Sequence, residues 1–152
     1  MKMSQSVAIY HYIAKCYGYM ADDAGQTMRQ EFALECYNDF AGTNCFLPAL
    51  NPTCSEEECK KFEEKFCAFY TRIEDVFKMT KGKYVAGDKL TVADFVLFSV
   101  ASLFINNPAA PHSGMVEAAK NTMKKNPCVC AWFERMSKEN APYLAERQMA
   151  PA

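Results

Sequence analysis

The segment from Thr91 to Ile105 constrains the fold more than any other part of the chain, because its side chains are apolar nearly all round a helix. Such a helix is stable only when other elements surround it, so it belongs at the centre of a folded domain. Thr91 stands at the N-cap and Asp94 three residues later, where each side chain can satisfy backbone groups at the helix start. Leu90 before the cap can pack on Phe95 after it as a hydrophobic staple. The sequence therefore predicts a buried, firmly capped central helix.

A second strong helix signal begins at Ser55, which has the capping-box spacing with Glu58. The glutamates that follow the cap suit the positive end of the helix dipole. Behind them, six bulky side chains share one helical face: Phe62, Phe66, Phe69, Tyr70, Ile73 and Phe77. Such a stripe could line a ligand pocket, but at helical spacing it is more typical of core packing, and we interpret it as core.

Helical spacing continues along most of the chain, and no segment alternates convincingly with the period of two that a strand would show. Asp22 or Asp23 can cap the helix that ends near Gly42, and Pro48 and Pro52 should stop or kink it. The other predicted helices are Gln5 to Tyr19, about Met115 to Lys124, a segment that starts at Asn126-Pro127, and Ala141 to Arg147. With 152 residues, enough for an independent core, the chain is predicted to be an all-α single domain of six or seven helices.

The charge balance excludes several classes of function. Seventeen basic and eighteen acidic side chains give a formal net charge of −1, and no basic run marks a nucleic-acid-binding surface. The longest nearly apolar stretch, Phe95 to Ile105, is well short of the roughly 20 residues that a membrane span needs. The first residues lack the apolar region of a signal peptide. We therefore expect a soluble intracellular protein, cytoplasmic unless an organelle takes it up, that binds neither nucleic acid nor membranes.

The eight cysteines are expected to be mostly free thiols that behave as small hydrophobic side chains. No metal is expected, because Cys128 and Cys130 have the wrong spacing for zinc, and neither His11 nor His112 has a second histidine at ligand spacing. Two thiols are candidates for reactivity. Of these two, Cys16 is expected to be buried. Cys128 falls near a helix N-terminus, where the reactive thiolate form is favoured.

The capped segment from Gly87 to Phe95 resembles the capping-box and staple signature of the helical C-terminal domain of cytosolic glutathione transferases. The opening segment QSVAIYHYIA, Gln5 to Ala14, is similar to the family's Gln-Ser-x-Ala-Ile-x-x-Tyr-Leu-Ala helix, which is the last helix of the N-terminal thioredoxin-like domain. Asn126-Pro127 and Trp132 to Arg135 fit the family's closing helices, with the general character of the sigma, mu and pi classes. The resemblance implies that residues 1–20 are a remnant of a thioredoxin-like domain that is otherwise largely missing, and that residues 21–152 form the helical C-terminal-like domain.

In the family, the Gln-Ser pair holds the γ-glutamyl carboxylate of glutathione, so the resemblance assigns glutathione binding to Gln5 and Ser6. The free N–H groups and partial positive charge of a helix start suit an anion. The alternative is that Ser4 or Ser6 only caps the helix. The sigma and pi classes also direct an acidic residue from the partner subunit to glutathione, and here Thr43 stands at that place. The electrophile pocket would lie near Asn44 to Leu50 and near the C-terminal helix.

No residue is assigned a catalytic role, because the family's catalytic Tyr, Ser or Cys and its cis-proline turn lie in the part of the thioredoxin-like domain that this sequence lacks. By this resemblance the chain is the helical half of a glutathione transferase, which supplies the hydrophobic-substrate wall and part of a homodimer contact. It would conjugate glutathione, its substrate, to electrophiles only if a thioredoxin-like domain were supplied. The alternative is a non-catalytic subunit of a larger assembly, a use that such domains have in translation factors and synthetase complexes. A redox or thiol-storage protein is a third, minor hypothesis.

Overall fold

The computed structural model describes residues 4–44, 55–107, 109 and 113–147. Within these residues the fold consists of seven helices and no strand, which confirms the predicted all-α class. The helices are α1 (Ser6–Tyr17), α2 (Ala24–Gly42), α3 (Glu56–Thr80), α4 (Val92–Ile105), α5 (Ser113–Lys125), α6 (Pro127–Glu139) and α7 (Ala141–Glu146). Pro48 and Pro52, which the sequence suggested as breakers of the second helix, lie outside the described residues.

The helix ends follow local capping chemistry. Asp23, one of the two candidates, caps α2, because its carboxylate accepts a hydrogen bond from the Gln26 N–H at 2.8 Å. Ser55 and Glu58 form a reciprocal capping box at the start of α3. α1 ends at Tyr17 rather than at the expected Tyr19, because Gly18 takes a left-handed conformation with φ of 78° and closes the helix.

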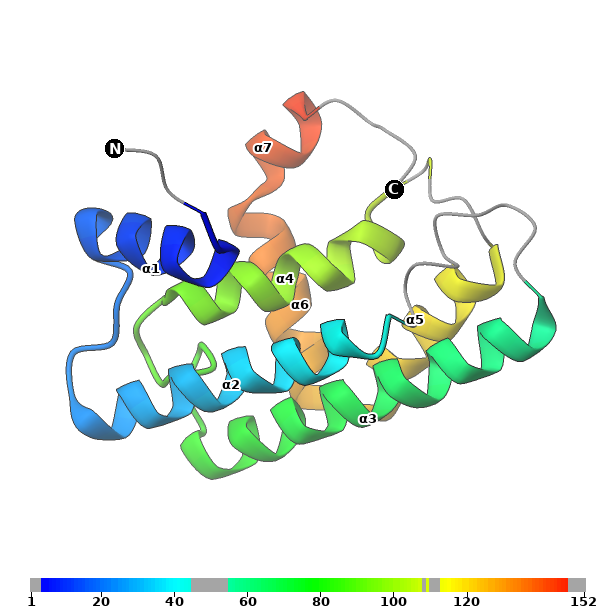
Figure 1. Cartoon of the computed structure of the whole chain (residues 1–152), viewed down its shortest axis with the longest axis horizontal. Coiled ribbons are helices and arrows are strands. Elements are labelled where there is room, and N and C mark those ends of the chain that lie inside the picture. The colour runs from blue at the N-terminus through cyan, green and yellow to red at the C-terminus, as the bar shows by residue number, and fades with distance from the viewer. Residues whose placement is uncertain (1–3, 45–54, 108, 110–112, 148–152) are drawn as a thin grey trace.

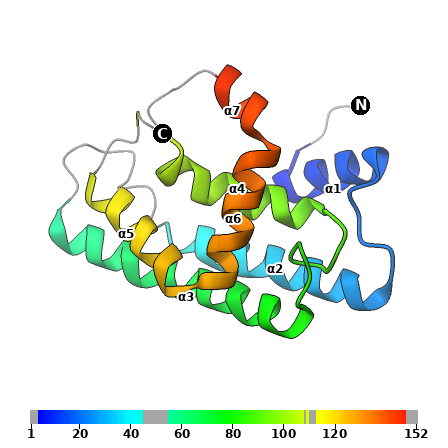
Figure 2. The ribbon, with the colours of Figure 1, turned by 180° about the vertical axis from the view of Figure 1, so that it is seen from behind.

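α4 lies in the middle of the bundle. Figure 1 shows α2 and α3 running antiparallel along one side of it, and Figure 2, seen from behind, shows α6 crossing it on the other side. α4 contacts α1, α2, α5 and α6, so apolar side chains on every side of the helix find a neighbour. This arrangement explains why a segment without a polar face is stable in this fold.

The apolar stripe of α3 packs into the core. Each of its six members is at most 5% exposed: Phe62, Phe66, Phe69, Tyr70, Ile73 and Phe77. Phe40 of α2 stacks on Phe69 with ring centroids 5.1 Å apart, and Phe104 of α4 lies 4.8 Å from Phe62. The Tyr70 hydroxyl donates to the Leu97 carbonyl at 2.7 Å, and burial raises the pKa of this phenol far above its usual range. The stripe therefore joins α2, α3 and α4 in one aromatic core.

The fully buried carboxylate of Asp94 holds the start of α4. One oxygen, Oδ2, accepts from the N–H and the hydroxyl of Thr91, each at 3.0 Å. The other, Oδ1, accepts from the Val85 N–H and from the Trp132 indole N–H of α6, also at 3.0 Å. Burial raises the pKa of this carboxyl, and the four donors oppose that rise. Asp94 thus caps its own helix and ties it to the preceding turn and to α6.

A second buried carboxylate, Glu74 of α3, supports the start of α6. Its Oε2 accepts from the Val129 N–H at 3.0 Å, while the N-cap residue Asn126 makes no side-chain capping bond. The Lys78 ammonium lies 3.7 Å from the other oxygen, Oε1. A carboxylate from a neighbouring helix therefore replaces the usual cap and complements the dipole of α6.

Asp94→Asn should destabilise the fold although it changes only one atom type. The amide nitrogen of Asn donates, so it would face donors that now meet an acceptor oxygen. We expect the free energy of unfolding in urea to fall by about 1–3 kcal/mol. Asp75→Asn, on the exposed side of α3, is the matched control and should stay within about 0.5 kcal/mol of the parent. A loss at Asp94 no larger than that of the control would contradict the role assigned to this carboxylate.

Candidate functional site

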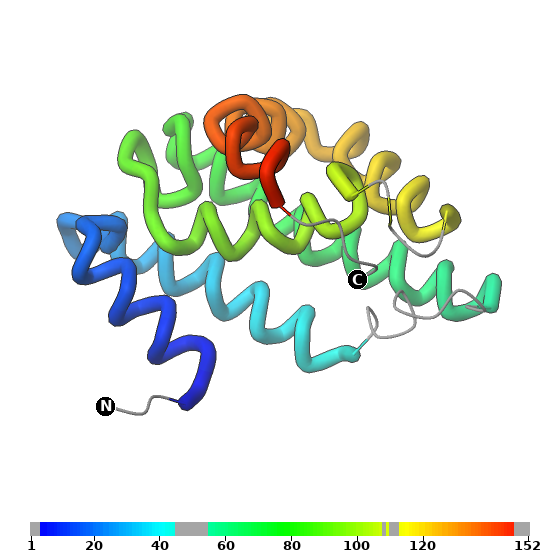
Figure 3. Tube along the Cα trace, turned by 90° about the horizontal axis from the view of Figure 1, so that it is seen from above, coloured from blue at the N-terminus to red at the C-terminus, as the bar shows by residue number. Residues whose placement is uncertain are grey.

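An apolar cavity of about 290 Å³ lies between α2 and α4. Figure 3 shows these two helices separating toward the C-terminal end of α2. The cavity lies near that end, because Tyr37 and Phe40 of α2 are part of its lining. Its lining is mostly aromatic and aliphatic: Tyr37, Phe40, Ser99, Val100, Leu103 and Phe104. The Ser99 hydroxyl is engaged, because it donates to the Val96 carbonyl at 2.8 Å. A concave apolar space with few polar groups is the usual form of a small-molecule site.

The sequence placed an electrophile pocket near Asn44 to Leu50 and the C-terminal helix. Asn44 follows the end of α2 and is exposed, while the rest of that segment lies outside the described residues. Among the described residues, the lining of the α2–α4 cavity comes from these two helices and not from α7. The contribution of α4 was missed, because the sequence shows that this helix is buried but not which of its residues border a gap.

Thr43 is the residue that the family resemblance puts at the position of the partner subunit's acidic residue. In the structure it lies in a groove other than the α2–α4 cavity. A groove of about 140 Å³ between α2 and α3 includes Thr43, Asp39 and Arg72 in its lining. The Thr43 hydroxyl donates to the Phe40 carbonyl at 2.6 Å, and the carboxylate of the groove belongs to Asp39, which pairs with Arg72 at 3.1 Å. Thr43 thus faces the outer side of the α2–α3 pair rather than the α2–α4 cavity.

Gln5 and Ser6 stand at the exposed start of α1. Gln5 is the N-cap residue with φ of 75°, a conformation that L-residues rarely adopt, and its side chain makes no capping hydrogen bond. The backbone strain at such a position costs on the order of 1–3 kcal/mol and is common at ligand sites. The first N–H groups of α1 are therefore open to an outside acceptor, which is the chemistry of an anion site.

The inner side of α1 carries a polar cluster against α2. His11 Nε2 lies 3.4 Å from a carboxylate oxygen of Glu31, and the same carboxylate accepts from the Gln30 amide at 2.8 Å. The Tyr10 hydroxyl is buried without a hydrogen-bond partner. In the sequence, no second histidine stands at metal-ligand spacing from His11. In the structure His11 contacts the carboxylate of Glu31, and sequence spacing alone could not reveal this contact.

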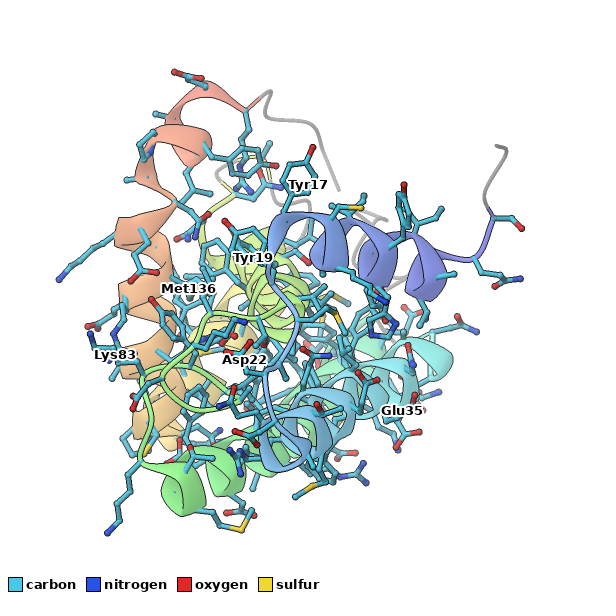
Figure 4. The ribbon with its side chains drawn as sticks, turned by 90° about the vertical axis from the view of Figure 1, so that its left-hand side faces the viewer. Tyr17, Tyr19, Asp22, Glu35, Lys83 and Met136 are labelled. Atoms are coloured by element: carbon cyan, nitrogen blue, oxygen red, sulfur yellow. The ribbon has the colours of Figure 1, made fainter. Side chains whose placement is uncertain are left out.

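The outer side of α1 is apolar and open to solvent. Tyr12 and Ile13 are 54% and 49% exposed, and Tyr17 in the last turn of α1 is 74% exposed. Figure 4 shows Tyr17 standing out from the C-terminal end of α1, away from the bundle. Large apolar side chains gathered on one helix face mark a surface that another element covers.

The cysteines depart from two expectations. Cys16 is exposed rather than buried, because the face of α1 that carries it points away from α4. Cys128 lies near the start of α6, but burial and the neighbouring Glu74 carboxylate raise the pKa of its thiol, which opposes thiolate formation.

The six cysteines of the described residues are all free, and no group of three or more His, Cys, Asp or Glu side chains there could hold a metal.

Comparisons with known proteins identify the family. A family model described as the glutathione S-transferase C-terminal domain matches residues 46–147. S-crystallin 3 of Enteroctopus dofleini is 22% identical over 153 residues, which cover 88% of this chain and 69% of that protein. The solved structure of the glutathione S-transferase Blo t 8 superimposes with a TM-score of 0.74 at 20% identity, over 96% of this chain and 64% of that one.

The chain thus spans about two thirds of the length of the proteins that it resembles. None of the helices in the described part of the chain has the length and apolar character of a membrane span. The family model covers well over half of the sequence, and the seven-helix bundle agrees with it. The chain belongs to the glutathione S-transferase family, of which it carries the helical C-terminal domain.

Proposed function

We propose that this chain is the hydrophobic-substrate half of a glutathione transferase, which conjugates glutathione to apolar electrophiles when a thioredoxin-like domain completes the site. The observation that carries this proposal is the apolar α2–α4 cavity, whose α4 side lies within the residues that the family model matches. Its volume of about 290 Å³ suits a small apolar molecule. No described residue is proposed to activate the glutathione thiol, so the chain alone supplies binding rather than catalysis.

Gln5 and Ser6 are proposed to hold a carboxylate of glutathione at the start of α1. Both residues are exposed, and the Gln5 side chain makes no capping hydrogen bond in this structure. An anion that accepts from the first N–H groups of α1 would also gain from the helix dipole. Glutathione is therefore the proposed substrate, and no metal is part of the proposal.

The proposed domain division places residues 1–20, with α1, as the last helix of a thioredoxin-like domain and residues 21–152 as the helical domain. Two observations support it. The outer face of α1 exposes Tyr12 and Ile13, as a helix would that normally packs on a sheet. About a third of the Blo t 8 chain lies outside the matched region, which is room for such a domain.

A homodimer is proposed to form through the outer face of α2 and α3. Met28 and Phe32, one turn apart on α2, are 60% and 45% exposed. The same face carries both charge signs, with Asp39 on α2 and Lys65 and Arg72 on α3 beside one groove. A twofold contact brings one patch against its own copy, so a patch with both signs is suited to it. The proposed location of the dimer is the cytoplasm.

The second candidate function is a structural subunit of a larger protein assembly. The observation that favours it is again the uncovered face of α1, which includes the large side chains of Tyr12 and Tyr17. A partner protein could cover this face in place of a thioredoxin-like domain. In that case the bundle would serve as a binding module, and neither glutathione nor an electrophile would be needed.

The cavity should bind a neutral apolar fluorophore. We expect N-phenyl-1-naphthylamine to bind the purified chain with a saturable rise in fluorescence. Leu103→Gln, which places an amide on the cavity wall, should weaken binding about tenfold, because the buried amide would lack a partner. Leu144→Gln is the matched control, since Leu144 is also half-buried but lies on α7, away from the cavity. Equal affinity in the parent and both variants would show that the fluorophore binds elsewhere and would remove the support for this site.

Glutathione should contact the start of α1 even without a complete partner domain. We expect titration with glutathione to shift the amide NMR resonances of residues 5–8 in a saturable way. Ser6→Ala should weaken this binding at least threefold, because one hydrogen bond to the ligand is lost. Ser113→Ala, at the exposed first position of α5, is the matched control and should leave the titration unchanged. Shifts that appear at both helix starts alike would indicate non-specific anion binding.

A further inference from the structure

The lining of the α2–α4 cavity carries two side-chain hydroxyls among the residues that the structure describes, those of Tyr37 and Ser99. The Ser99 hydroxyl already donates to the Val96 carbonyl at 2.8 Å. The Tyr37 hydroxyl forms no hydrogen bond within the described part of the chain. It is also not one of the polar atoms that are buried without a partner, so it is accessible to solvent. A ligand that enters the cavity can therefore reach the Tyr37 hydroxyl.

The position of Tyr37 on α2 makes it part of the cavity wall. Tyr37 and Phe40 stand three residues apart, so they are neighbours on one face of the helix, and both belong to the lining. Phe40 is buried, whereas Tyr37 is half-buried, with its side chain packed against the core. A tyrosine in such a place keeps its apolar ring in the wall and its polar tip within reach of water. Tyr37 therefore adds a hydrogen-bonding group to a wall that is otherwise apolar.

The rest of the lining decides which ligands can use this hydroxyl. None of the described lining side chains is charged, so an ionised ligand would lose its water without gaining a counter-charge. Tyr37, Phe40 and Phe104 contribute aromatic rings, against which a flat aromatic ligand can pack. A phenol O–H donates hydrogen bonds, and a carbonyl oxygen accepts them without carrying a charge. The ligand that matches this wall is a neutral aromatic molecule with a carbonyl group.

We propose that Tyr37 is a specificity-determining residue of the α2–α4 cavity, whose hydroxyl donates a hydrogen bond to the carbonyl oxygen of a neutral aromatic ligand. The preferred ligands are then aryl ketones, aldehydes and esters rather than ionised aromatic acids. This inference rests on the proposed function, because it assumes that the cavity takes an apolar ligand. It adds a selection among such ligands that the apolar part of the wall cannot make.

The test compares three naphthalenes of nearly the same shape. The side group of 2-acetylnaphthalene carries a carbonyl oxygen, that of 2-isopropylnaphthalene carries a methyl group in its place, and that of 2-naphthoate is an anion. Each compound would displace N-phenyl-1-naphthylamine from the full chain, with fluorescence as the readout. We expect both neutral compounds to bind, and 2-naphthoate to bind about tenfold more weakly than the ketone, because its charge finds no partner in the lining.

Tyr37→Phe removes the hydroxyl and keeps the ring. It should weaken the affinity for 2-acetylnaphthalene about three- to tenfold, which is the range that one hydrogen bond provides, and leave the affinity for 2-isopropylnaphthalene unchanged. The hydroxyl has no partner in the described part of the chain, so its removal should leave the fold intact. Tyr19→Phe is the matched control, because Tyr19 is 39% exposed and lies outside the lining, and it should keep the parent's ratio of the two affinities.

A second measurement reports the hydrogen bond itself. The infrared carbonyl band of bound 2-acetylnaphthalene, labelled with a heavy isotope at the carbonyl carbon, should lie at lower frequency than in hexane, because a hydrogen bond weakens the C=O bond. Tyr37→Phe should return the band toward its position in hexane. A band that is the same in the parent chain and in Tyr37→Phe would mean that this hydroxyl does not contact the carbonyl.

The outcomes separate this inference from the proposed function. If both neutral naphthalenes bind but Tyr37→Phe weakens neither, or weakens both alike, the role of Tyr37 is overturned while the apolar site stands. Binding of 2-naphthoate as tight as that of the ketone would overturn the selection of neutral ligands. If no compound displaces the fluorophore from the cavity, the inference and the proposed apolar site are both overturned.

Discussion

The structure depends on a buried carboxylate at the start of its central helix. Asp94 accepts hydrogen bonds from Thr91, Val85 and Trp132, so one side chain fixes the start of α4, the turn before it and the crossing of α6. Glu74 of α3 plays a similar part at the start of α6, where its carboxylate accepts a hydrogen bond from the Val129 N–H. Such groups are costly to bury and stabilise the fold only when their partners are in place, which makes the relative positions of these helices specific. An apolar core alone would leave the rotation and register of α4 less defined.

Fixing α4 has a direct consequence for the candidate site. The residues from Ser99 to Phe104, about two to four turns beyond the cap, are held opposite Tyr37 and Phe40 of α2, and the space between them is the apolar cavity. α1 covers another side of α4, while its outer face stays exposed. The outer face of α1 therefore has a proposed use of its own, which is to contact another domain or protein.

Local sequence signals predicted much of this fold, and long-range contacts account for what they missed. The caps at Asp23 and Ser55 and the aromatic stripe of α3 depend on residues close together in the chain, and the observed helices agree with them. The spacing of Thr91 and Asp94 indicated a capping box, but nothing local could show that Asp94 also binds Trp132, 38 residues later. The exposure of Cys16 was predicted wrongly for the same reason, because it depends on which side of α1 meets α4. Gln5 and Ser6 are proposed as site residues only through the family motif, and the unpaired hydroxyl of Tyr10 is visible only in three dimensions.

The native mass of the endogenous protein, with its companions identified by mass spectrometry, tests the central claim most directly. The claim is that this bundle works as part of a free, transferase-type dimer. The account predicts a particle of about twice the mass of its own polypeptide, with no other subunit. Co-migration with a much larger assembly of different proteins would contradict it and would make the chain a structural subunit that uses a transferase-type helical domain.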